Sequence, residues 1–473
     1  MKNTSQIRHG TCIKKVRGFN MNKNGTKEMT SGSPWKLILS FSIPLLFGML
    51  FQQFYSMVDS IIVGKYLGVD QLAAVGSTSS INFMIIGFCM GVCNGFAIPV
   101  AQRFGAGDYK GLRKFTANSV WLSILLSSIM TVIVCILCRD ILHWMNTPKD
   151  IIEDAYAYIF VLFLGIPATY LYNLCSGIIR SLGDSKTPLV FLLLSSVLNI
   201  VLDLVFVIVI KMGVAGAAWA TVVSQFISGV LCLFYMKKKY EILKFQKGEA
   251  KPDGNCIKTL CFMGIPMGLQ YSVTAIGSVI LQTAVNDLGS AYVASVAAGS
   301  KLFIFLACPL DALGSTIATY AGQNVGAGKI ERIGQGVKVS VILGSMYAVI
   351  AFLISMLFGE YLSLLFVKKH ETVILAQTIQ YIRMQALFFI PLCLVIVLRF
   401  CIQGLGYSML AILAGVFEMI ARTIIGVFIV AKLGYIAVCI ANPTAWIFAD
   451  CFLVPAFFYV IWRLKKEKMQ QEA

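Results

Sequence analysis

The sequence predicts an all-α integral membrane protein with twelve transmembrane helices in two pseudo-symmetric six-helix bundles. The first observation is composition: 58% of the 473 residues are hydrophobic and 13% are charged, against about 45–50% and about 25% in soluble domains. The second is a series of apolar runs near or above the ~20 residues that cross a bilayer. The third is an internal repeat, in which motifs of the first half recur in the second.

Clusters of charged residues, Gly and Pro divide the chain into apolar spans. We expect the twelve spans to run approximately over residues 35–64, 73–102, 115–138, 156–179, 188–210, 213–235, 260–285, 293–323, 337–358, 379–402, 410–430 and 435–462. Several exceed the length that crosses a bilayer, so we expect them to tilt or to project beyond it. We also expect a break in the eighth span at Pro309.

The distribution of Lys and Arg orients these spans in the membrane. Most of these residues lie in the terminal segments and in the connections after even-numbered spans, as at 237–239 and 465–466. The connections after odd-numbered spans hold few. Because short cytoplasmic segments are enriched in Lys and Arg, we expect a multi-pass protein of the cytoplasmic membrane with both termini in the cytoplasm.

The two halves of the chain carry the same motifs in the same order. Gln102 and the Gly-Ala-Gly sequence at 105–107 recur as Gln323 and the Gly-Ala-Gly sequence at 326–328. Because each unit contains an even number of spans, both halves enter the membrane from the same side, which gives parallel repeats. Each Gly-Ala-Gly sequence follows a transmembrane helix rather than a strand, and no Lys-Ser or Lys-Thr pair completes a nucleotide-binding loop, so we interpret both as tight cytoplasmic turns.

The repeat sets the domain boundaries that we expect. They are a polar basic N-terminal tail (1–34), an N-lobe six-helix bundle (35–235), a basic cytoplasmic linker (236–259), a C-lobe six-helix bundle (260–463) and a cytoplasmic tail (464–473). The N-terminal tail lacks the apolar core of about 7–15 residues that marks a cleavable signal peptide. Transporters use two such halves to enclose a central cavity that opens alternately to either side.

Carboxylates inside the spans are the main functional signal, because a mid-membrane charge costs from about 2.5 to well over 10 kcal/mol. Asp203 lies one helical turn after Asn199 on the fifth span. Thr221 on the sixth span reaches a similar depth, and Asp59 ends a polar face of the first span. We expect these residues to form a cation-binding and coupling site for H⁺ or Na⁺. The alternative is a structural hydrogen-bond network between packed helices.

A second charged pair lies in the eleventh span. Glu418 and Arg422 are four residues apart, which is the spacing of an ion pair on one helix. Because a paired carboxylate is poorly placed to cycle its charge, we interpret this pair as structural. The sequence assigns no role to Lys301, Asp311 or Asp450.

Other classes of protein have little support. The net charge of +17 comes from Lys and Arg in short segments between spans, so it does not predict a nucleic-acid-binding face. Most of the 14 Cys lie in apolar stretches, where Cys behaves as a small hydrophobic residue. No catalytic Ser/His/Asp, Cys/His or zinc-binding pattern occurs in the sequence. We therefore expect neither an enzyme nor a cofactor, and no metal other than Na⁺ at the coupling site.

Two stretches carry a resemblance to a known family. The sequences SIPLLFGMLFQQFYSMVDSIIVG and NIVLDLVFVIVIKMGVAGAAWAT, with the Gly-Ala-Gly turns and the two halves, resemble the multidrug and toxic compound extrusion (MATE) family, especially its MepA-like and DinF-like bacterial branches. The resemblance implies a V-shaped pair of lobes that exchange cations for amphipathic drugs. DinF-like members bind the cation in the N lobe, and the resemblance assigns that role to Asp59, Asn199, Asp203 and Thr221.

The resemblance also separates this chain from another branch. NorM-type members rely on acids in the seventh and tenth helices, whereas the seventh span here contains Gln270 and Gln282, and the tenth contains no acid. We therefore do not expect a C-lobe cation site of that kind. Together with Gln52 and Gln53 on the first span, these glutamines are candidates to line the substrate cavity.

We accordingly expect a cation-coupled antiporter that exports amphipathic, cationic organic compounds. Its expected partners are small-molecule substrates and membrane lipid, without nucleic acid, and we expect a monomer. The alternative within transport is a flippase or exporter of lipid-linked or polysaccharide precursors of the wider superfamily. Acids and amides outnumber bases in the N-lobe spans, which favours cationic or neutral cargo. A channel or a sensor would also be helical, but neither predicts two similar halves with a buried carboxylate site.

Overall fold

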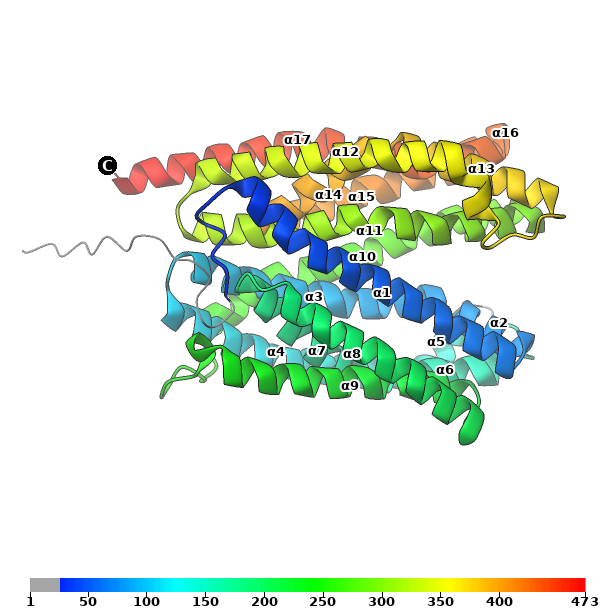
Figure 1. Cartoon of the computed structure of the whole chain (residues 1–473), viewed down its shortest axis with the longest axis horizontal. Helices are drawn as coiled ribbons and strands as arrows, with labels where there is room; N and C mark the ends of the chain where they lie inside the picture. The colour runs from blue at the N-terminus through cyan, green and yellow to red at the C-terminus, as the bar shows by residue number, and fades with distance from the viewer. Residues whose placement is uncertain (1–25, 146, 473) are drawn as a thin grey trace, which may run out of the picture.

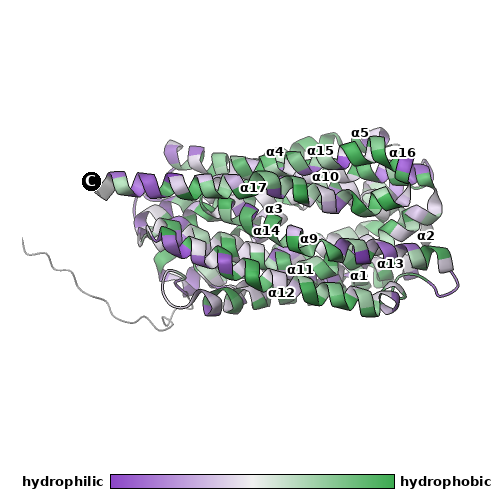
Figure 2. Cartoon of the chain, turned by 90° about the horizontal axis from the view of Figure 1, so that it is seen from above, coloured by the Kyte–Doolittle hydropathy of each residue, from purple (hydrophilic) through white to green (hydrophobic). Residues whose placement is uncertain are grey.

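The computed structural model describes residues 26–145 and 147–472, and every regular element in this part of the chain is a helix. Residues 1–25 of the expected N-terminal tail lie outside the described residues. The helices lie side by side in one elongated bundle (Figure 1). Hydrophobic residues dominate the middle of this bundle and hydrophilic residues gather at its two ends (Figure 2), which is the pattern of a multi-pass membrane protein.

The first half of the chain comprises α1 (Pro34–Tyr66), α2 (Val69–Ser77), α3 (Ser79–Gly105), α4 (Tyr109–Ile136), α5 (Cys138–Trp144), α6 (Ile152–Leu164), α7 (Ile166–Ser181), α8 (Lys186–Asp203), η1 (Leu204–Val209) and α9 (Val214–Lys239). The linker contains the short helix η2 (Glu241–Leu243). The second half comprises α10 (Gly254–Leu288), α11 (Ser290–Gly326), α12 (Ile330–Ser363), α13 (Thr372–Leu387), α14 (Phe389–Gly404), α15 (Ser408–Ile424), η3 (Ile425–Ile429), α16 (Val430–Leu433) and α17 (Tyr435–Glu472).

The twelve expected spans are present, and two of them are bent. Ten helices of the described chain are each long and apolar enough to cross a membrane. The other two spans are the pairs α6 with α7 and α13 with α14, which bend by 45° and 53°. Pro167 and Pro391 lie just after these bends, and proline cannot donate the backbone hydrogen bond that would continue the preceding helix.

Two local expectations differ from the structure. The break expected in the eighth span is wrong, because α11 runs unbroken through Pro309. The hydroxyl of Tyr347 donates to the carbonyl of Leu306 at 2.8 Å, which satisfies a backbone acceptor in the turn before the proline. Conversely, the second span divides into α2 and α3 at Thr78, where the Ser77 and Thr78 hydroxyls donate to carbonyls of the preceding turn.

The first helix of each half crosses from one half to the other. The first turns of α1 pack into a core formed with α11 and α12, whereas its far end packs against α6 and η1. Helix α10 mirrors this path, because its first turns belong to the core of the first half and its far end packs against η3 and α17. The crossing of α1 is visible in Figure 1. Each half is therefore tied to the other by one long helix.

The contact between α3 and α10 is exceptionally close. A Cβ at Gly91 would lie 2.5 Å from the carbonyl oxygen of Met267, and a Cβ at Gly95 would lie 2.5 Å from the Cα of Gly264. Small residues spaced four apart let transmembrane backbones approach in this way. We call this contact the glycine seam, and it joins the two halves along one side.

The two Gly-Ala-Gly turns meet at the end of the bundle where the C-terminus lies (Figure 1). The Nε2 atom of Gln102 donates to the carbonyl of Gly404 at 3.1 Å, and the Nε2 atom of Gln323 donates to the carbonyl of Ser181 at 2.8 Å. Each bond joins one half to the other. Together they form a pseudo-symmetric contact that we call the clasp, and we call this end of the bundle the clasp end.

The clasp depends on two glycines. A Cβ at Gly105 would lie 1.9 Å from the carbonyl oxygen of Gln323, and a Cβ at Gly326 would lie 1.9 Å from that of Gln102. No side chain fits at such distances, so only glycine lets the ends of α3 and α11 touch. The halves are therefore closed against each other at the clasp end.

Candidate functional site

The structure brings the four expected coupling residues together between α1, α8 and α9. Asp59 on α1 is 9% exposed and Asp203 at the end of α8 is fully buried. Their carboxyl groups are near enough to interact electrostatically. Asn199, one turn before Asp203, donates from its Nδ2 atom to the Oγ1 atom of Thr221 at 3.3 Å. The facing inferred from the spacing of these residues therefore agrees with their positions.

This cluster contains more acceptors than donors. Both carboxylate oxygens of Asp203, the Oδ1 atom of Asp59 and the Oδ1 atom of Asn199 have no hydrogen-bond donor among the described residues. Ionised carboxylates only accept hydrogen bonds, and two of them in contact away from water repel each other. One proton or one small cation between the two carboxyl groups would balance both the charge and the hydrogen bonds. The donor set therefore fits a single positive charge.

A change in helix geometry begins directly after Asp203. The chain continues as the π-helix η1, whose wider turns interrupt the α-helical pattern. In the second half, α15 gives way to the π-helix η3 at the equivalent place in the repeat. Short π-helical segments inside longer helices occur frequently at functional sites. Both halves therefore interrupt the fifth span at the depth of their buried charges.

The equivalent region of the second half contains its own compensating charges. Glu418 accepts from Arg422 at 3.3 Å and also from Arg399 on α14. Arg422 donates in turn from Nε to Asn442 at 3.0 Å. All three charged residues are at most 8% exposed. Arg399 was not assigned to this pair from the sequence, because its helix faces Glu418 only once α14 and α15 pack.

The two halves thus differ in how the buried acidic charge of this region is compensated. Asn442 occupies the position on its helix that Thr221 occupies in the first half, since both lie equally far beyond the glycine that precedes their helices, Gly434 and Gly213. In the second half the positive charge is a guanidinium held by the fold. In the first half the two acids have no basic partner in the described part of the chain. At this position the first half therefore leaves room for a mobile cation, whereas the second half does not.

The four candidate cavity glutamines have different surroundings. Gln52 and Gln53 on α1 are half-buried, and Gln282 on α10 is exposed. Gln270 is buried, and its Oε1 atom accepts from Gln403 at 2.6 Å. Gln270 is therefore engaged in a bond between α10 and α14, and the other three have side chains that reach accessible surface.

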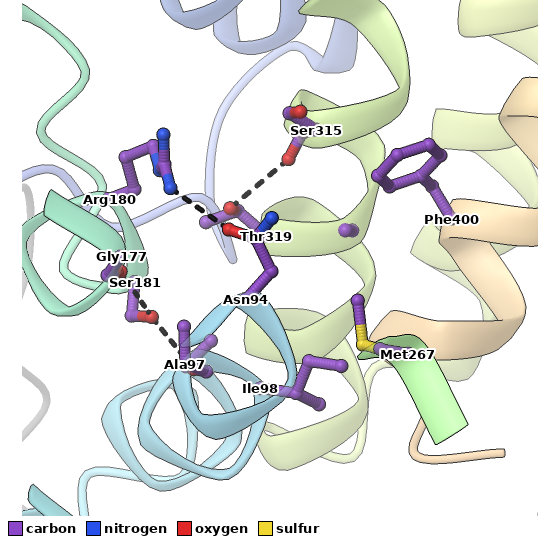
Figure 3. A pocket seen from close by; sticks show the side chains of 12 residues that line it. Asn94, Ala97, Ile98, Gly177, Arg180, Ser181, Met267, Ser315, Thr319 and Phe400 are labelled. Atoms are coloured by element: carbon purple, nitrogen blue, oxygen red, sulfur yellow. Dashed lines mark hydrogen bonds between the residues drawn. The ribbon is translucent and has the colours of Figure 1, made fainter. Parts of the chain in front are cut away.

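A small cavity of about 50 Å³ lies between the halves next to the clasp. Figure 3 shows Arg180 from α7 donating to Asn94 from α3, and the bond length is 3.0 Å. Ser315 and Thr319 from α11 line the opposite side of the cavity. Arg180 was missed in the sequence because it follows the fourth span, where a basic residue reads as part of a connection. The structure instead places its charge at the interface of the halves.

Comparison with known proteins addresses the family. The MatE family model matches the chain twice, over residues 44–205 and 266–428, which is the internal repeat seen in the sequence. A Bacillus subtilis protein named "Probable multidrug resistance protein YpnP" is 29% identical over 440 residues, covering 93% of this chain and 98% of the relative. "Multidrug export protein MepA" of Staphylococcus haemolyticus is 23% identical and covers 81% of this chain and 85% of the relative.

Solved structures agree with the observed fold. A structure described as the outward-facing conformation of a multidrug resistance MATE family transporter superposes with a TM-score of 0.87 at 23% identity, covering 95% of this chain and 99% of that one. The resemblance seen in the sequence is thereby confirmed. Two matches to one family model, a relative aligned over nearly the whole length and the shared twelve-span fold lead to one conclusion. The chain belongs to the MatE family of multidrug and toxic compound extrusion proteins, which are membrane transporters and not enzymes.

Proposed function

We propose that this transporter is a cation-coupled antiporter that exports amphipathic, cationic organic compounds across the cytoplasmic membrane in exchange for H⁺ or Na⁺. The observation that carries this proposal is the acid pair Asp59 and Asp203. Its buried oxygens have no donor among the described residues, and one bound cation would satisfy them. The names of relatives of similar length, one a probable multidrug resistance protein and one a multidrug export protein, support the class of cargo.

The proposed orientation places the clasp end in the cytoplasm. The basic end of α9 at 237–239 and the basic stretch of α17 at 465–466 lie at this end, and cytoplasmic segments favour Lys and Arg. With the clasp closed, the transporter is then outward-facing. The lobes keep the proposed boundaries 35–235 and 260–463, and the linker 236–259 is cytoplasmic.

The proposed mechanism couples the site to the clasp through α1. Cation binding neutralises Asp59 and Asp203 and removes their mutual repulsion, so α1 and α8 repack around the site. Asp59 lies near one end of α1, and the other end packs against the second half next to the clasp. A change at the acid pair therefore reaches the contact between the halves, as two-state coupling requires.

Efflux of a cationic dye from vesicles, under separately imposed H⁺ and Na⁺ gradients, tests the proposal. Asp203→Asn mimics the neutral state of the pair and should lose uphill, ion-dependent efflux while still binding dye. Asp59→Asn should do the same. The matched control is Asp450→Asn, a half-buried aspartate on α17 whose Oδ1 also lacks a donor among the described residues. Gradient-coupled efflux at the wild-type rate in Asp203→Asn would refute the site.

A further inference from the structure

The segment just before α1 crosses the boundary between the halves at the clasp end. We call residues 26–33 the strap. On the first-half side, the backbone N–H of Lys27 donates to the carbonyl of Leu182 at 3.1 Å. The carbonyl of Lys27 lies so close to Gly183 that a Cβ there would sit 1.8 Å away. One end of the strap is thus seated on the turn between α7 and α8.

The next residues of the strap bind the second half. The backbone N–H of Met29 donates to the Oε1 atom of Gln323 at 2.8 Å, and its carbonyl accepts from Asn324 at 3.2 Å. Lys329 donates to the carbonyl of Thr30 at 2.8 Å, and Arg332 donates to a further strap carbonyl at 3.0 Å. Met29 and Thr30 are each only 1% exposed. The sequence predicts a polar tail here, yet Met29 and Thr30 of the strap are as buried as residues of the core.

Gln323 links the strap to the clasp. Its Nε2 atom makes the clasp bond to Ser181 while its Oε1 atom accepts from Met29. Gln102, its counterpart in the repeat, makes its clasp bond to Gly404 without such a segment. The chain before α10 instead contacts α4, where Trp121 donates to Ala250 at 2.9 Å. The strap therefore reinforces one side of a contact that is otherwise pseudo-symmetric.

We propose that the strap is a conformational latch that holds the halves together at the clasp end and must leave its seat on the first half before that end opens. The number of hydrogen bonds to each half indicates from which half the strap detaches. The strap makes several hydrogen bonds to the second half and buries Met29 there, but it makes one backbone bond to Leu182. It therefore stays with the second half and parts from the turn between α7 and α8. This inference rests on the alternating opening assumed in the proposed function.

The latch is tested by measuring the clasp directly. Spin labels on Tyr109→Cys and Glu331→Cys, two exposed positions that begin α4 and α12 on opposite sides of the clasp, report its opening by pulsed electron paramagnetic resonance. The full chain is reconstituted with the cysteines that the label reaches replaced by serine. Met29→Asp places a charge in the buried seat, and Ser31→Asp is the matched control with the same charge at an exposed position.

We expect Met29→Asp to raise the ratio of open to closed clasp about tenfold, which corresponds to about 1.4 kcal/mol, and Ser31→Asp to leave it unchanged. The double variant Lys329→Ala with Arg332→Ala removes the hydrogen bonds that these two side chains of the second half donate to strap carbonyls. It should shift the ratio in the same direction. A wild-type ratio in either folded variant, or an equal shift in Ser31→Asp, would overturn the latch. The measurement needs neither dye nor ion gradient, so its failure is separate from failure of the efflux assay.

Discussion

Replacing Gly105 by alanine should open the clasp by an amount that the structure sets. The added Cβ would lie 1.9 Å from the carbonyl oxygen of Gln323, whereas non-bonded carbon and oxygen atoms stay about 3.3–3.6 Å apart. The two turns must therefore separate by roughly 1.4 Å. The bonds from Gln323 to Ser181 and from Gln102 to Gly404, at 2.8 and 3.1 Å, then lengthen beyond hydrogen-bonding distance. At ~1 kcal/mol each, their loss shifts the clasp equilibrium roughly thirtyfold.

The assay is the same distance measurement between labels at Tyr109→Cys and Glu331→Cys. Gly326→Ala should reproduce the shift, because its Cβ would meet the carbonyl of Gln102 at the same 1.9 Å. Gly334→Ala is the control, since a Cβ at this helical glycine meets nothing within 4 Å. If Gly105→Ala kept the wild-type distance distribution, closure would not depend on contact between the two turns, and the reasoning would be refuted.

Two further predictions concern charges away from the acid pair. Glu418→Gln leaves Arg399 and Arg422 buried without a carboxylate, so it should destabilise the fold by about 3–5 kcal/mol, seen as a lower melting temperature in detergent; an unchanged melting temperature would contradict it. In the linker, a hydrogen bond from Arg113 at 2.6 Å, then one from a backbone N–H, lower the pKa of Glu249 from 4.5 to about 2. Since the pKa of Glu249 is lower in the folded protein, the stability that this contact contributes is fully present above pH 4.5 and is lost as the pH falls toward about 2. Proteolysis of the linker should therefore stay constant between pH 7 and 5.

The bilayer explains why so much of the fold follows from the sequence. Every span must be a long apolar helix, so counting apolar runs locates the helices. Breaks inside a span are harder to predict, because they depend on neighbours. Pro309 leaves α11 intact where Tyr347 supplies a donor nearby, while Thr78 divides a span that looked continuous.

The candidate site shows the same division between local and tertiary information. The pairing of Asn199 with Asp203 depends on helix periodicity, and the sequence therefore predicts that they share a face. The second partner of Glu418 depends on how α14 packs against α15, so the sequence places Arg399 inside a span but does not pair it with Glu418. The strap is a stronger case, since a polar tail gives no sign that Met29 is buried between distant turns.

The glycine seam has a consequence for how the two halves diverge. At Gly91 and Gly95 the backbone of α3 lies against the backbone of α10, so a side chain added on one helix cannot be absorbed by rearranging side chains on the other. A relative with larger residues at these positions must hold the two helices further apart. A chimera that joins one half of this chain to the other half of such a relative would inherit either an overlap or a gap along the seam. Residues of α3 and α10 along the seam, although distant in sequence, must therefore change together during evolution.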